Sequence, residues 1–132
     1  MDLSKYDPKE VSEKGCTMEV RHPVTLVPLP KVTITLAGED SKRFRQMQQR
    51  LANKMLDGRG RVKLSAEQTW ENSISMLARC TLSWTGIEWE GKSLPCNESN
   101  AAMVYRELDW LREQVDSFVN DRANFMGNFS EN

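Results

Sequence analysis

Two short stretches of this 132-residue chain alternate apolar and polar side chains, and they set the strongest limit on its fold. In residues 17–21, Met18 and Val20 alternate with polar neighbours, and residues 31–36 repeat the pattern with β-branched side chains. A period of two residues is typical of a strand with one buried face. Because a two-stranded ribbon is only marginally stable by itself, it must pack on helices or pair with another chain.

The sequence that follows changes to apolar spacings of three and four residues, which indicate amphipathic helices. We expect the first helix to begin at Asp40 or Ser41, whose side chains can accept an amide hydrogen bond. Ser65 and Asn97 are predicted to cap two further helices, and Asp109 begins a final one. This order of strands and then helices favours an α+β domain.

A segment rich in glycine and tryptophan separates the second and third predicted helices. The helix before it is expected to carry one face formed by Trp70, Ile74, Leu77, Ala78 and Thr81. Residues 84–95 are expected to form a structured loop or a short hairpin. The final helix is predicted to carry an apolar stripe formed by Leu111, Val115, Phe118 and Phe125. We therefore predict one domain over residues 1–132, with a polar lead-in at 1–15, a β-ribbon at 16–37 and about four short amphipathic helices within 40–126.

Charge is unevenly distributed, although the net charge is only −1. Residues 42–63 contain eight basic residues and one acidic residue, whereas residues 86–132 contain four basic and nine acidic ones. At 100° per residue, three cations fall within an arc of about 40° beside the apolar stripe of the first helix. They are Arg43, Arg50 and Lys54. Oppositely charged segments attract each other within one molecule or between copies, so we expect a homo-oligomer; solvated helix faces that merely differ in charge are the alternative.

A basic turn and two tryptophans complete the candidate partner contacts. Trp84 and Trp89 lie in the Gly-rich segment, where an interface role and core packing are equally consistent with the sequence. Arg59 and Arg61 lie in a turn whose charges suit phosphates, but no aromatic residues are interleaved there for stacking on single strands. Since the whole chain is slightly acidic, we expect solvent or an acidic protein at this turn, and no nucleic acid. The other two tryptophans, Trp70 and Trp110, are predicted to pack in the core.

No sequence pattern supports catalysis or cofactor binding. The single histidine, His22, and the widely separated cysteines indicate neither a zinc site nor a Cys–His nucleophile. The glycine motifs of phosphate loops and nucleophile elbows are absent from the sequence. An odd number of cysteines favours a reducing compartment, and no apolar run approaches the roughly 20 residues that cross a membrane. We therefore expect a binding protein that is not an enzyme and uses no metal, cofactor or membrane.

The order of motifs along about 100 positions resembles that of the tail assembly chaperones of long-tailed bacteriophages. The segments that carry the resemblance are Gly38-Glu39-Asp40-Ser41, Ser65-Ala66-Glu67-Gln68, Trp84-Thr85-Gly86-Ile87, Asn97-Glu98-Ser99-Asn100-Ala101 and Trp110-Leu111-Arg112-Glu113-Gln114-Val115. They look like the family's turn into its first helix, the start of the next helix, the tryptophan-glycine turn after it, and a last helix that ends near Asn124-Phe125. The loop Pro28-Leu29-Pro30 has no counterpart in this pattern.

The resemblance implies a non-catalytic role in phage morphogenesis. Chaperones of this family bind the long helical tape measure protein, keep it soluble and help the tail tube protein to polymerise around it. The expected location is the host cell cytoplasm during phage assembly, because a chaperone leaves before the virion matures. The alternative is a permanent structural protein of the virion, from the tail, the connector or the capsid surface. In both cases the partners are other phage proteins.

Overall fold

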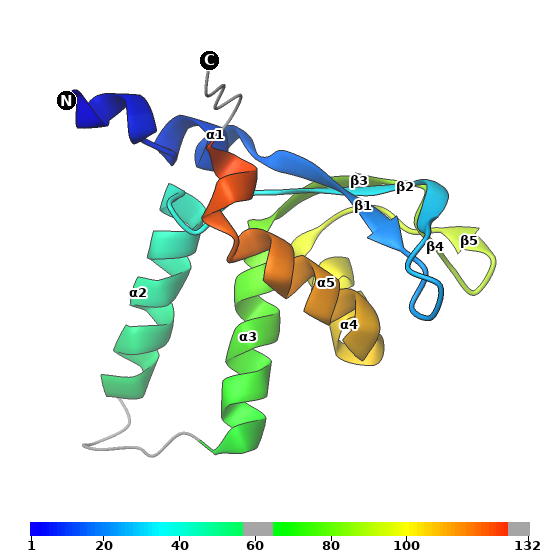
Figure 1. Ribbon diagram of the computed structural model, residues 1–132. Helices are drawn as coiled ribbons and strands as arrows, with labels where there is room; N and C mark the ends of the chain where they lie inside the picture. Colours follow the sequence, from blue (N-terminus) through cyan, green and yellow to red (C-terminus); the bar gives the residue numbers. More distant parts are fainter. Residues whose placement is uncertain (57–64, 127–132) are drawn as a thin grey trace.

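The computed structural model describes residues 1–56 and 65–126, which form a mixed α+β fold (Figure 1). The fold class predicted from the sequence is thereby confirmed. In chain order the elements are η1 (Leu3–Tyr6), α1 (Lys9–Lys14), β1 (Cys16–Arg21), β2 (Pro28–Leu36), α2 (Lys42–Leu56), α3 (Ala66–Cys80), β3 (Thr81–Thr85), β4 (Glu88–Trp89), β5 (Lys92–Ser93), α4 (Glu98–Glu107), α5 (Asp109–Val119) and η2 (Arg122–Phe125).

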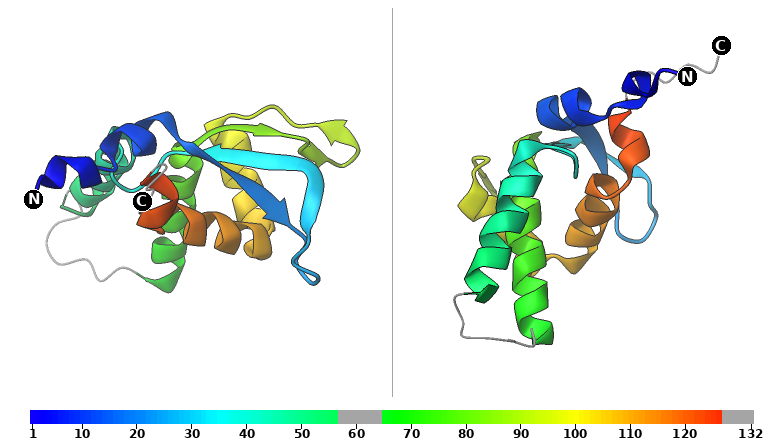
Figure 2. Two further views of the ribbon diagram at one scale, coloured as in Figure 1. Left: turned by 45° about the horizontal axis from the view of Figure 1, so that its top comes forward. Right: turned by 90° about the vertical axis from the view of Figure 1, so that its left-hand side faces the viewer.

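A three-stranded antiparallel sheet in the order β1-β2-β3 organises the molecule. The register places Met18 beside Ile34 and Ile34 beside Trp84, which forms one row of apolar side chains across the sheet. Helices α3, α4 and α5 lie under the face that carries this row, while α2 runs beside α3 (Figure 2). The alternation of residues 17–21 and 31–36 therefore places the buried face as predicted.

The outer face of the sheet is polar and is held together by threonine pairs. The hydroxyl groups of Thr17 and Thr35 lie 2.8 Å apart, and those of Thr33 and Thr85 lie 2.7 Å apart. Such cross-strand hydrogen bonds stabilise neighbouring strands. This face thus needs no covering layer of helices.

The third strand corrects the predicted secondary structure around Thr81. The sequence assigns Thr81 to a helical face, but α3 ends at Cys80 and β3 begins at the next residue. The Thr81 hydroxyl donates a hydrogen bond to the Leu77 carbonyl at 2.8 Å and lies 2.6 Å from the Tyr105 hydroxyl. Contacts with β2 and with Tyr105, both distant in sequence, therefore override the helical spacing. The expected hairpin within 84–95 is present as β4 and β5.

The polar lead-in at 1–15 is also more structured than the sequence indicates, since it contains η1 and α1. Ser12 of α1 is fully buried, and its carbonyl accepts the Gly38 N–H at 3.1 Å. A Cβ on Gly38 would lie 2.7 Å from the Ser12 hydroxyl oxygen and 2.8 Å from the Phe125 ring. Because Gly38 has no side chain, both α1 and η2 can pack against the backbone at this residue.

Two further boundaries refine the sequence interpretation. Helix α2 begins where expected, because the Ser41 hydroxyl accepts the Phe44 N–H at 3.2 Å. Phe125 is buried as predicted, but it belongs to η2 and not to the last helix, which ends at Val119. None of the helices in the described ranges combines the length and apolar character that a membrane-spanning segment requires.

Candidate protein-binding surfaces

The exposed face of α2 is basic and rich in amides. Arg50 and Lys54 line one shallow depression together with the polar side chains Gln46, Gln49 and Asn53. Arg43 behaves differently, because its guanidinium donates to the carbonyl of Arg79 at 3.1 Å and so fastens α2 to the end of α3. The predicted ridge thus divides into one cation with a structural contact and two that face solvent in one depression. Arg59 and Arg61 lie outside the described residues.

The two tryptophans of the Gly-rich segment pack against the core and are only half-exposed. Trp84 lies on the inner face of β3, where its indole Nε1 donates to the Leu94 carbonyl at 2.8 Å. Trp89 lies in β4. The hairpin of β4 and β5 is at the end of the molecule opposite to α2 (Figure 1). The structure therefore does not combine the tryptophans and the α2 cations into one surface.

The tryptophans assigned to the core from the sequence are likewise half-buried. Trp70 and Trp110 both pack against the core cluster with part of the side chain exposed. Trp110 also lines the groove described next. Its large amphipathic ring is therefore available to a partner while it contributes to packing.

A groove of about 830 Å³ lies between β1 and α5, and sequence reasoning did not predict it. Strand β1 provides one wall through Thr17, Glu19 and Arg21, and α5 provides the other. The wall formed by α5 includes Trp110, Glu113, Gln114 and Phe118. No local sequence pattern predicts such a site, because its two walls are about ninety positions apart in the sequence.

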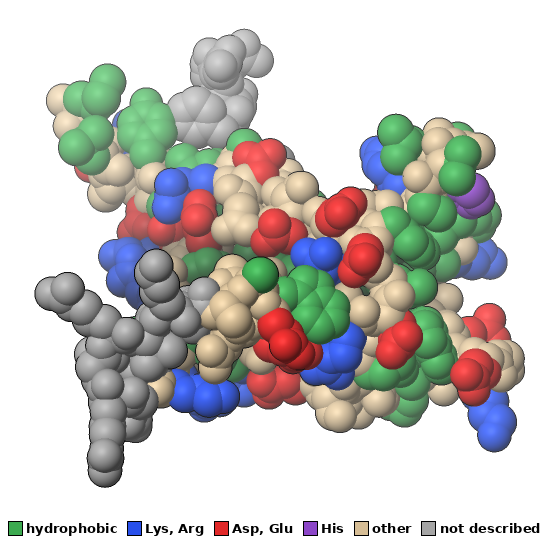
Figure 3. Space-filling view, turned by 90° about the horizontal axis from the view of Figure 1, so that it is seen from below, with side chains coloured by type: hydrophobic (Ala, Val, Ile, Leu, Met, Phe, Trp, Pro, Cys, Tyr) green, Lys and Arg blue, Asp and Glu red, His purple; other side chains and the backbone are tan. Residues whose placement is uncertain are grey.

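One end of the groove is formed by the loop that joins β1 and β2, which we call the 22–27 loop. Three apolar side chains of this loop are exposed, Val24 by 81%, Leu26 by 62% and Val27 by 61%. Figure 3 shows apolar side chains gathered around the single histidine, His22. From the sequence, Pro23, Pro28 and Pro30 predict a loop or an edge strand here, because proline cannot donate to a ladder. This is correct for Pro23 but wrong for Pro28 and Pro30, which belong to β2, the middle strand of the sheet. The exposed apolar tip of the loop is a further candidate contact with a partner.

Hydrogen bonds hold the 22–27 loop in one conformation. The Nδ1 atom of His22 accepts the N–H groups of Val24 at 3.0 Å and Thr25 at 3.2 Å. Leu26 has a φ of 61°, a conformation that branched side chains rarely adopt, and Arg21 donates to its carbonyl. Since strain of this kind persists only where the surroundings enforce it, the apolar tip is presented as a preformed surface.

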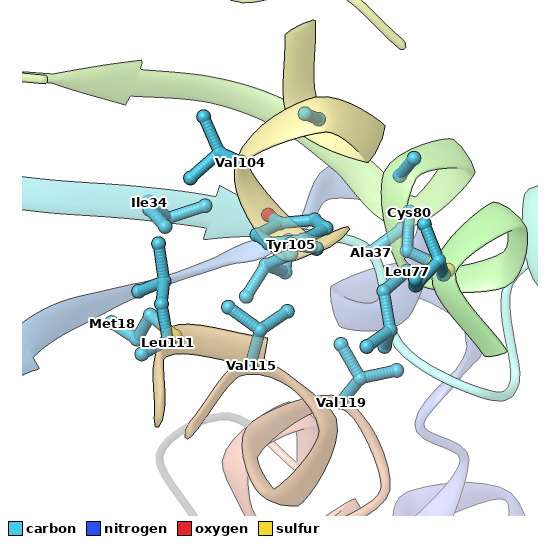
Figure 4. Close-up of a cluster of buried hydrophobic side chains, with 14 of the residues drawn as sticks. Met18, Ile34, Ala37, Leu77, Cys80, Val104, Tyr105, Leu111, Val115 and Val119 are labelled. Atoms are coloured by element: carbon cyan, nitrogen blue, oxygen red, sulfur yellow. The ribbon is translucent and has the colours of Figure 1, made fainter. Parts of the chain in front are cut away.

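The ionisable groups of the core favour their neutral forms. Burial raises the pKa of the Cys80 thiol to about 12, and it also raises the pKa of the Tyr105 hydroxyl. Figure 4 shows both side chains among the apolar groups that surround them. Within the described parts of the chain, no group of three or more potential metal ligands occurs.

Comparison with known proteins found no family model, no curated protein and no solved structure that matches this chain. A functional assignment therefore depends on the motifs and surfaces of the chain itself.

Proposed function

We propose that this chain is a tail assembly chaperone of a long-tailed phage, which binds the tape measure protein and promotes assembly of the tail tube without catalysis. The order of the motif segments carries the proposal. Their polar residues mark boundaries of the fold: Ser65 accepts the Gln68 N–H at 3.1 Å at the start of α3, and Asn97 accepts the Asn100 N–H at 2.8 Å at the start of α4. The same order of boundaries is what the family resemblance implies.

The surfaces of the molecule support a role in binding. A client that is long, helical and poorly soluble has apolar side chains that need temporary cover. The 22–27 loop offers exposed apolar side chains in a fixed conformation, and the groove beside it adds the half-buried rings of Trp110 and Phe118. The basic depression on α2 provides a separate contact, at Arg50 and Lys54, for an acidic partner.

A permanent structural protein of the virion is the second candidate. The observation that favours it is that the exposed apolar 22–27 loop is held by internal hydrogen bonds, because lasting interfaces are more apolar and better preformed than transient ones. The two proposals make opposite statements about the mature particle. A chaperone is absent from it, whereas a structural protein is present in a defined number of copies.

Co-expression with the tape measure protein of the same phage tests the chaperone proposal. The wild-type chain is expected to keep the tape measure protein in the soluble fraction and to co-purify with it. The variant Val24→Asp/Leu26→Asp places charges on the apolar tip and is expected to lose this effect. A charge change outside the 22–27 loop, Lys92→Glu on the exposed strand β5, serves as the control.

Mass spectrometry of purified virions separates the two candidates. Absence of the chain from virions, together with a soluble complex in the co-expression experiment, supports the chaperone. Its presence in virions together with an insoluble tape measure protein would overturn the chaperone and support the structural protein.

A further inference from the structure

We propose that the outer edge of β1 binds an extended, basic segment of a partner protein as a fourth strand of the sheet. This segment would lie in the groove between β1 and α5. The inference goes beyond the proposed function and does not depend on it, because it concerns how a partner is held and not which phage protein the partner is.

Strand β1 lies at one edge of the sheet. Strand β2 lies in the middle, with β1 on one side and β3 on the other. The indole of Trp84 on β3 is hydrogen-bonded to Leu94, and this bond ties the chain after the β4–β5 hairpin to β3. Among the residues that the structure describes, no strand pairs with the outer edge of β1. An unpaired edge is a template for a further strand.

The side chain of Gln114 contacts the backbone of Arg21. The Arg21 N–H donates to Gln114 Oε1 at 3.0 Å, and Gln114 Nε2 donates to the Arg21 carbonyl at 2.9 Å. A residue on a neighbouring antiparallel strand would make the same reciprocal pair of bonds. The side-chain amide of α5 thus imitates a strand at one position, which shows that the backbone groups of Arg21 point into the groove.

The same backbone orientation extends along β1. Exposed and buried side chains alternate without interruption through the strand, with Met18 and Val20 buried and Thr17, Glu19 and Arg21 exposed. Backbone groups of alternate residues in a strand point to the same edge. The register with β2 shifts between Glu19 and Arg21, but the alternation within β1 continues across this shift. Thr17 and Glu19 therefore present their N–H and C=O groups to the same side as Arg21, and both residues line the groove.

Charge and shape identify the occupant. The groove is lined by three carboxylates, those of Glu19, Glu113 and Asp121, against one cation, Arg21. The half-buried rings of Trp110 and Phe118 supply its apolar surface. An extended segment that alternates basic and apolar side chains satisfies both features, because successive side chains of a strand point to opposite faces. Both views of Figure 2 show α5 beside β1, and residues of both elements line the groove.

Binding of synthetic peptides to the full-length chain tests the proposal. The probe is a short peptide of alternating lysine and valine, and its binding is followed by amide chemical shifts and hydrogen exchange. We expect shifts and slower exchange at the amides of Thr17 and Glu19. A peptide with the same side chains but N-methylated at every backbone amide cannot donate a hydrogen bond to the strand edge. We expect it to bind at least about tenfold more weakly.

Variants of the two walls locate the site. Glu113→Lys is expected to weaken binding of the lysine–valine peptide, and an alternating glutamate–valine peptide is expected to gain affinity for this variant. Gln114→Ala removes the side chain that occupies the edge at Arg21, so the peptide is expected to bind more tightly. Gln46→Ala on the exposed face of α2 is the matched control and is expected to leave the affinity unchanged.

Several results would overturn the proposal. These are equal affinities of the methylated and unmethylated peptides, equal affinities of the glutamate and lysine peptides for the wild type, or shifts confined to α2. Absence of binding at about 1 mM peptide would do the same. If Gln114→Ala fails to fold, the Glu113→Lys variant, whose side chain is exposed, still decides the outcome.

Discussion

Arg122 binds Asp40 through two hydrogen bonds, from Nε to Oδ2 at 2.7 Å and from Nη2 to Oδ1 at 3.2 Å. The Glu39 carboxylate lies 3.3 Å from the same guanidinium. The hydrogen bond to Asp40 and the charges of Asp40 and Glu39 raise the pKa of Arg122. Because Asp40 and Arg122 are 82 positions apart, this contact fastens the C-terminal turn η2 to the residues that lead into α2.

Replacement of Arg122 by alanine is expected to loosen both ends of the chain while the core stays folded. The reason is that η2 packs on Gly38, where α1 also docks, so release of η2 uncovers α1. Hydrogen exchange should become faster at the amides of α1 and η2. Arg106→Ala is the control, because it removes a comparable pair with Glu71 between α3 and α4; faster exchange of α1 in this control would contradict the expectation.

Replacement of Gly38 by alanine is expected to destabilise the protein by about 2–3 kcal/mol, since a new methyl group must displace packed neighbours. The added Cβ would meet Ser12 and the Phe125 ring at distances below 3 Å. Denaturant unfolding measures the change. Gly91→Ala is a useful comparison, because Gly91 has a φ of 81° but no atoms within 4 Å of the added Cβ. We expect it to cost about 1 kcal/mol through backbone strain alone, and an equal effect of the two variants would refute the packing argument.

The hydroxyl pair of Tyr105 and Thr81 predicts unequal effects of two substitutions. Thr81 donates to the Leu77 carbonyl, so it accepts its second bond from Tyr105. Tyr105→Phe removes one hydrogen bond and should cost about 1 kcal/mol. Thr81→Val removes both bonds and leaves the buried Tyr105 hydroxyl without its acceptor, so the cost should be about 2–3 kcal/mol. Equilibrium unfolding in urea compares them, and the reverse order would rule out this network.

Alkaline pH is expected to destabilise the protein through Cys80. Burial raises the pKa of this thiol from 9.0 to about 12, so between these values the unfolded state loses a proton that the folded state retains. Stability is therefore fully present below pH 9 and falls toward pH 12, with a slope of up to about 1.4 kcal/mol per pH unit from this group. Unfolding of Cys80→Ala should show a shallower slope over this range than the wild type. An unchanged slope would show that Cys80 is not responsible.

Patterns within a few residues were sufficient to predict much of the fold. The alternation around Met18 and Ile34 determines which sides of β1 and β2 are buried, because one face of each strand meets the core. The caps at Ser65 and Asn97 mark helix starts, because their side chains accept bonds from amides three residues later. Arg50 and Lys54 lie on one surface, as the helical spacing predicted.

Features that depend on distant partners were not predicted. Thr81 lies four residues after Leu77, so its spacing is helical, and only β2 and Tyr105 make it the start of a strand. Helix α1 is short, and its burial at Ser12 depends on the absence of a side chain at Gly38. The groove needs α5 to lie beside β1, and the amide of Gln114 has no local signal that connects it with Arg21.

The direct transition from α3 to β3 has a mechanical consequence. No residue intervenes between Cys80 and Thr81, and the hydroxyl of Thr81 is bonded back to the helix. The junction therefore contains no connecting loop, and we expect α3 to move together with the sheet. A displacement of the far end of α3 by a bound protein is then expected to reach the strands.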